Sequence, residues 1–163
     1  MKVITVQSRY FIDRYLEGKE KPSLSEFRLK DRRSTFILKK YMFPKLREIG
    51  WNGVDGFFWG WVKNPYLDFQ RDSLAYDSEE MDMLCLNLPL DRLVLSDFDE
   101  WTSLLLGEKS GYVSESEEEK LLWGCKDIGC GLEDVEFGES DGKAIQCCFL
   151  NFKKEDIVWR RQY

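Results

Sequence analysis

Short runs of alternating, β-branched or aromatic residues recur along the chain and predict a β-sheet. Side chains of a strand point alternately to the two faces of its sheet, so such runs suit strands with at least one buried face. Helix signals lie between the runs, so we expect helices and strands together in an α+β fold. The expected strands are Lys2–Gln7, Phe57–Val62, Met83–Leu88, Ala144–Phe152, a short one at Leu93–Leu95 and a last one from Ile157.

The length of 163 residues suits one domain, and 43 % apolar residues are enough for a core. We therefore expect residues 1–163 to form a single α+β domain, with several helices packed on a mixed, mainly antiparallel sheet. The expected core contains Ile4, Phe36, Tyr41, Leu84, Leu86, Leu95, Trp101, Leu122, Phe149 and Ile157.

Capping signals mark the first two expected helices. Ser8 can accept a backbone N–H at the start of Arg9–Glu17, and Gly18 suits the left-handed residue that follows a helix. The segment Thr35–Ile49 has an amphipathic pattern. Pro44 interrupts it, so we expect a kink or two short helices there.

Two further helices are expected in the second half of the chain. Asp97 with Glu100, and Ser114 with Glu117, have the spacing of capping boxes, although Asp97 replaces the usual Ser or Thr. These helices should end near residues 106 and 123. The glycine-rich stretch that follows is expected to be a loop with a short strand at Val135–Phe137.

The formal charge of −6, from 30 acidic and 24 basic residues, opposes general nucleic-acid binding, which requires a basic field. The basic residues between 30 and 47 are interpreted as a solvated helix face and its approach loop. The acidic run at 115–119 has four glutamates, too few for a DNA mimic.

The chain has no histidine, which removes the commonest general base and metal ligand. Its five cysteines are an odd number, and no secretion signal precedes them, so we expect reduced thiols in a cytoplasmic protein. Cys125 and Cys130 lack a second pair at metal-ligand spacing, so no zinc is expected. No apolar run is long enough to predict a membrane span.

Five motifs resemble, in order, a bacterial family of domains of unknown function, family 3841. They are Thr5–Ser8, Trp59–Trp61, the Leu-Ser-Asp-Phe-x-x-Trp element at Leu95–Trp101, Ile145–Phe149 and Lys154–Ile157. The chain departs from the family pattern before the aromatic segment, where a proline is missing, and in a shorter, glycine-richer middle. The resemblance supports the fold and implies no chemistry.

The sequence predicts a binding or interaction module with an aromatic-lined cleft. Tryptophan rings would form the walls for a planar ligand or a partner peptide, and polar groups near a strand end would anchor it. The alternative that these rings are core stays open. The residues of the predicted cleft are Arg9, Trp59, Trp61, Ser96, Asp97 and Trp101.

Two other functions stay open. One is an enzyme that resembles ADP-ribosyltransferases and uses NAD without histidine, with Arg9 and Ser96 as polar groups and Glu136 or Glu139 as the late glutamate. The other is an acidic inhibitor from a phage or a mobile element, suggested by charge and size. No cofactor is expected outside the NAD alternative. The ligand or protein partner and the oligomeric state stay open.

Overall fold

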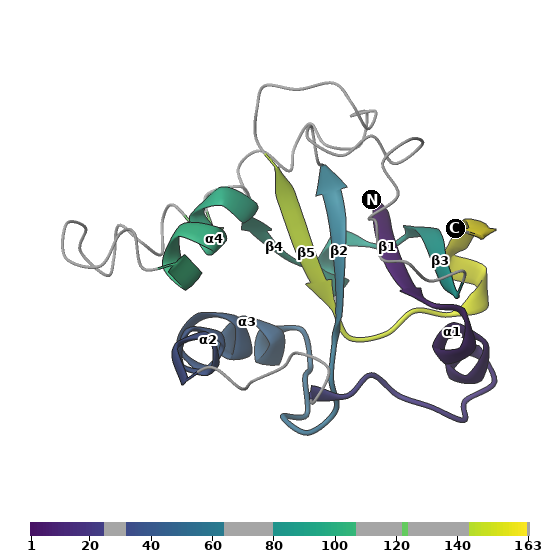
Figure 1. The fold of residues 1–163 in the computed structure, drawn as a ribbon, viewed down its shortest axis with the longest axis horizontal. Helices are drawn as coiled ribbons and strands as arrows, with labels where there is room; N and C mark the ends of the chain where they lie inside the picture. The colour runs from purple at the N-terminus through teal and green to yellow at the C-terminus, as the bar shows by residue number, and fades with distance from the viewer. Residues whose placement is uncertain (25–31, 64–79, 107–121, 124–143, 163) are drawn as a thin grey trace.

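Six strands form one sheet in the part of the chain that the computed structural model describes, residues 1–24, 32–63, 80–106, 122–123 and 144–162 (Figure 1). Their order is β4-β5-β2-β1-β3-β6, and every described pairing is antiparallel. The α+β prediction is confirmed. The strands are β1 Lys2–Ser8, β2 Phe58–Lys63, β3 Met81–Asn87, β4 Val94–Asp97, β5 Ile145–Phe149 and β6 Ile157–Gln162.

The two faces of the sheet carry different buried clusters. On one face, Val3 and Leu84 pack with Phe11 of α1, and we call this the α1 face. On the other face, Val94 and Cys148 pack with a helical layer, and we call this the α3 face. The strand alternation predicted from the sequence produces this division. Adjacent cysteines 147 and 148 accordingly lie on opposite faces.

The helix α1 (Arg9–Leu16) begins and ends as its capping residues predict. The Ser8 hydroxyl accepts the Phe11 N–H at 3.5 Å. Gly18 has a φ of 72°, the left-handed conformation that ends many helices, and its N–H bonds to the Tyr15 carbonyl.

The expected second helix is a continuous helical run from residue 32 to residue 48. It consists of α2 (Arg32–Ile37), a π-helical turn η2 (Leu38–Met42) and α3 (Phe43–Glu48). Pro44 lies in the first turn of α3. The preceding π turn bonds the Phe43 N–H to the Leu38 carbonyl, which accommodates the missing proline N–H without ending the run.

Strand β4 leads directly into α4 (Phe98–Leu106), as the capping signal at Asp97 predicts. The Asp97 carboxylate accepts the backbone N–H groups of Asp99 and Glu100 at 3.0 and 3.2 Å. It thus satisfies two of the unpaired donors at the start of the helix. Short 3-10 turns at Leu90–Arg92 and Lys154–Asp156 precede β4 and β6.

Most of the predicted core is confirmed, but Phe36 is wrong because its side chain is 61 % exposed. Leu38 and Met42 face the sheet, and Phe36 lies about 200° around the helix from Leu38. Its ring instead contacts solvent and the Lys40 ammonium, 6.0 Å from the ring centroid. Ile157 is only partly buried, at the margin of the α1-face cluster.

Gly60 marks a close approach between β2 and β1, one of the two interpretations of a glycine within a strand. A Cβ there would lie 2.6 Å from Val3 Cγ1. The irregular register of β2 lies further along, between Trp61 and Lys63. Within the described ranges, no helix combines the length and apolarity needed to cross a bilayer.

Candidate ligand-binding site

The predicted tryptophans come together on the α3 face, where they hold α4 against the sheet. The ring centroids of Trp59 and Trp101 are 5.8 Å apart, and those of Trp61 and Phe98 are 4.8 Å apart. Trp101 is only 4 % exposed, whereas Trp59 and Trp61 are partly buried. The row is therefore continuous with the core, and only the β2 tryptophans reach the surface.

The polar residues predicted beside these rings are occupied by structural contacts. Ser96 is fully buried, and its hydroxyl accepts the Gln146 side-chain amide at 3.0 Å. The Asp97 carboxylate caps α4 through Oδ1. Both side chains thus serve the strand β4 and the helix that follows it.

Arg9 does not join this group. Its guanidinium binds the Asp82 carboxylate of β3 at 2.9 Å, and β3 lies on the side of β1 remote from β2. Asp82 also binds Arg160 of β6, which in turn binds Asp13 of α1 at 2.6 Å. The Asp82 side chain is only 4 % exposed. This network joins α1, β3 and β6 around a buried carboxylate.

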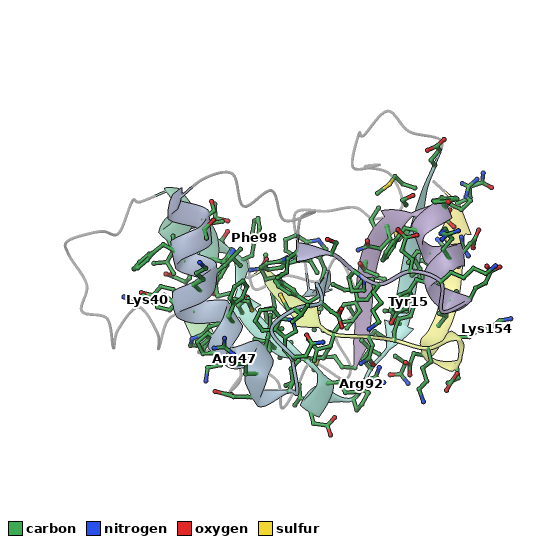
Figure 2. The ribbon with its side chains drawn as sticks, turned by 90° about the horizontal axis from the view of Figure 1, so that it is seen from below. Tyr15, Lys40, Arg47, Arg92, Phe98 and Lys154 are labelled. Carbon is green, nitrogen blue, oxygen red and sulfur yellow. The ribbon has the colours of Figure 1, made fainter. Side chains whose placement is uncertain are left out.

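A cavity of about 270 Å³ lies elsewhere, beside the C-terminal end of α1. Four segments line it: Tyr15 of α1, Lys21 with Pro22, the turn at residues 50–56, and Leu150–Asn151 after β5. Tyr15 and the α4 residue Phe98 lie well apart in Figure 2, consistent with the separate places of α1 and α4 in Figure 1. The cavity is therefore distinct from the predicted aromatic cleft.

The turn at residues 50–56 is held by its own side chains. The Trp51 indole N–H donates to the Asp55 carbonyl at 2.7 Å. The side-chain oxygen Oδ1 of Asn52 accepts the N–H groups of Val54 and Asp55, and its side-chain amide nitrogen donates to Asp55 Oδ2 at 2.8 Å. Asn and Asp favour such local bonds in turns. The Asp55 carboxylate is consequently fixed at the cavity wall.

Two contacts join this turn to the segment that follows α1. The Gly56 N–H donates to the Pro22 carbonyl at 2.7 Å. The Lys21 ammonium lies 3.3 Å from Asp55 Oδ2. A Cβ at Gly56 would lie 2.6 Å from the Pro22 carbonyl carbon, so only glycine allows this approach. The Lys21–Asp55 pair closes the same wall.

The Leu150–Asn151 side of the cavity is held by Tyr15 and Arg92, which lie near each other (Figure 2). The Tyr15 hydroxyl donates to the Phe152 carbonyl at 3.1 Å and accepts the Phe152 N–H at 3.0 Å. Arg92 donates to the carbonyl and the side-chain oxygen of Asn151 at 2.7 and 3.0 Å. Burial raises the pKa of the Tyr15 phenol, which therefore stays neutral.

Two charged side chains of opposite sign, Lys21 and Asp55, line the cavity. Hydrogen bonds from Asn52 and Lys21 hold the pKa of Asp55 below its usual range, so it is ionised at neutral pH. Within the described part of the chain, both side-chain donors to this carboxylate reach Oδ2, and no donor to Oδ1 is present. The Lys21 side chain is 73 % exposed, so its ammonium is free to move.

The described thiols take no part in this cavity. Cys85, Cys147 and Cys148 are free and buried, and burial raises their pKa values. Several residues and segments named in the sequence analysis lie outside the described residues: Cys125, Cys130, Glu136, Glu139, the 114–121 segment and Val135–Phe137. Among the residues that are described, no group of three or more His, Cys, Asp or Glu side chains is placed to hold a metal ion.

No protein-family model matches the sequence, and comparisons with curated proteins and with solved structures give no match. The resemblance to family 3841 stays a prediction.

Sequence reasoning missed the cavity because its walls come from distant segments. Asn52-Gly53 is a turn signal that the sequence displays openly. The approach of Pro22 and Asn151 to that turn depends on the tertiary structure, which no local pattern specifies. The turn itself was predictable, and its partners were not.

Proposed function

We propose that this domain is a binding module for a small molecule, and that its site is the cavity between α1 and the turn at residues 50–56. The observation that carries the proposal is the composition of the cavity wall. Aromatic and aliphatic side chains, Tyr15, Trp51 and Leu150, adjoin the fixed polar groups of Asn52 and Asp55. Small-molecule sites in proteins combine apolar walls with a few well-placed polar groups in this way.

The size of the cavity limits the ligand. Its volume of about 270 Å³ is near the lower end of ligand pockets, which span roughly 300–1,000 Å³. At about 30 Å³ for each liquid water, it corresponds to roughly nine water molecules. The part of a ligand that the cavity holds is therefore on the order of ten non-hydrogen atoms.

The rigidity of the wall favours binding. Asp55 is oriented by Asn52 and by the backbone of its own turn, and Tyr15 is bonded at both its donor and its acceptor positions. A ligand that enters such a site does not have to order these side chains, which lowers the entropic cost of association. The aromatic cleft lacks this advantage because Ser96 and Asp97 are already occupied.

A screen of small polar and aromatic compounds by NMR tests the proposal. The Trp51 indole N–H reports on the cavity, because it donates to the Asp55 carbonyl and its residue lines the site. The Trp159 indole is the internal reference, because β6 lies at the edge of the sheet. We expect at least one compound to shift the Trp51 signal in a saturable manner without shifting that of Trp159.

Two substitutions separate binding in the cavity from binding elsewhere. Leu150→Trp places a larger side chain in the cavity and should abolish the saturable shift. Val54→Trp is the matched control, because Val54 belongs to the same turn but is 76 % exposed and does not line the cavity. A library without any compound that shifts Trp51, or a compound that binds Leu150→Trp as well as the native chain, would contradict the proposal.

A further inference from the structure

We propose that the cavity binds a small zwitterion, a molecule with an ammonium and a carboxylate on one apolar body, such as a free amino acid with an aliphatic side chain. This inference rests on the proposed function and adds the chemical class of the ligand. Its basis is the placement of Asp55 and Lys21, of opposite charge, on one wall of a small cavity that Tyr15, Pro22, Trp51 and Leu150 also line.

Asp55 supplies the site for the ammonium. Its carboxylate is held in place by the Asn52 amide at 2.8 Å and by the turn that Asn52 closes. In the described part of the chain its side-chain donors converge on Oδ2, which leaves Oδ1 to accept from a ligand. A fixed carboxylate oxygen at a cavity wall is a suitable acceptor for an ammonium N–H, and such charge-assisted bonds are among the strongest.

Lys21 supplies the site for the carboxylate. Its ammonium lies 3.3 Å from Asp55 Oδ2, on a side chain that is 73 % exposed. Exposed pairs of this kind contribute little stability and are screened by salt. A ligand therefore exchanges one weak pair for two contacts, its ammonium on Asp55 and its carboxylate on Lys21.

The remaining walls select an apolar body of limited size. Pro22, Leu150 and the rings of Tyr15 and Trp51 lie around the charged pair. The cavity holds a molecule of on the order of ten non-hydrogen atoms, which is the size of a free amino acid. A dinucleotide would not fit wholly within the volume of about 270 Å³.

Four small probes test this class directly by titration of the Trp51 indole signal. L-Leucine carries both charges, 3-methylbutylamine lacks the carboxylate, 4-methylpentanoate lacks the ammonium, and glucose is a neutral polar molecule. We expect L-leucine to bind at least about tenfold more tightly than either singly charged analogue, because each charge-assisted bond contributes about one decade of affinity. Glucose should bind most weakly.

Two substitutions should change the affinities for the two singly charged analogues in opposite directions. In Lys21→Met the Asp55 carboxylate is released, so 3-methylbutylamine should bind at least as tightly as before and 4-methylpentanoate more weakly. In Asp55→Asn the Lys21 ammonium is released, so the preference should reverse. L-Leucine should lose about tenfold in affinity in both variants. If this pair had a purely structural role, each substitution would weaken the binding of all four probes to the same extent.

The outcomes for this inference and for the proposed function are distinct. Equal binding of L-leucine and the singly charged analogues, or preference for glucose, would overturn the zwitterion inference while the cavity remains a ligand site. No binding of any of the four probes would also overturn it. The proposed function fails only if the wider compound screen yields no ligand at Trp51. The titration of the four probes into the native chain tests the inference by itself. A variant that fails to fold therefore does not affect this test.

Discussion

Replacement of Gly56 by alanine should disrupt the cavity wall through a steric conflict that the structure defines. The new Cβ would lie 2.6 Å from the Pro22 carbonyl carbon and 2.6 and 2.7 Å from the nitrogen and carbonyl carbon of Ser23. Carbon–carbon contacts are favourable at about 3.5 Å, so the two segments would have to separate by roughly 0.9 Å. These are backbone atoms, so no side-chain rotation relieves the conflict.

The cost has two parts. Overpacking of this kind costs about 1–3 kcal/mol. The separation also lengthens the 2.7 Å bond from the Gly56 N–H to the Pro22 carbonyl beyond the hydrogen-bonding range, at about 0.5–1.5 kcal/mol. We therefore expect Gly56→Ala to lower the free energy of unfolding by about 1.5–4.5 kcal/mol. For a domain of this size, that corresponds to a Tm roughly 3–18 °C lower.

Urea denaturation followed by far-UV circular dichroism measures this change, and Gly53→Ala is the matched control in the same turn. Gly53 has a φ of 82° and no atom within 4 Å of an added Cβ, so alanine there incurs only the left-handed backbone strain of about 1–2 kcal/mol. A Gly56→Ala variant that is no less stable than Gly53→Ala would refute the close approach of Pro22 and Ser23 to this turn.

Three further substitutions or reactions test other parts of the fold. Asp97→Ala should cost about 1 kcal/mol of stability through loss of the α4 cap, and an unchanged urea midpoint would argue against that role. Asp82→Asn should cost about 2–4 kcal/mol, because two arginines lose their shared buried counterion; a loss below about 0.5 kcal/mol would mean that the network contributes little. Because burial raises the pKa of Cys147 and Cys148, a thiol reagent should modify them only after unfolding, and fast modification of either in the native chain would contradict their burial.

Local patterns predicted the elements of the fold well. The strands were found because period-two alternation survives in any sheet with a buried face, and the helix starts were found because Ser8 and Asp97 carry the oxygen that a helix start needs. The order of the strands was not predicted. It depends on which strands pair across long stretches of chain, such as β1 with β3, and no local signal carries that information.

The exposed Phe36 shows where pattern reasoning failed. An aromatic residue at the start of an amphipathic run was assigned to the core by its hydrophobicity, although Leu38 and Met42 determine the inward face of that run. The phase of the helix, including its π-helical turn, decides which apolar residue points outward.

The candidate site was the least predictable part. Trp59 and Trp101 do meet, as the sequence suggested. Arg9, chosen with them, instead binds Asp82, because its position after β1 places it beside β3. Tyr15 and Asp55 line the same cavity, although they belong to segments that share no sequence motif.

A crystal structure of the chain with the tightest ligand from the compound screen would locate the binding site directly. We expect the ligand to lie in the cavity, in contact with the Trp51 side chain and with Asp55 Oδ1, and Lys21 to have moved from Asp55 to the ligand. A ligand bound instead against the exposed parts of Trp59 and Trp61 on β2, with the cavity unchanged, would contradict it.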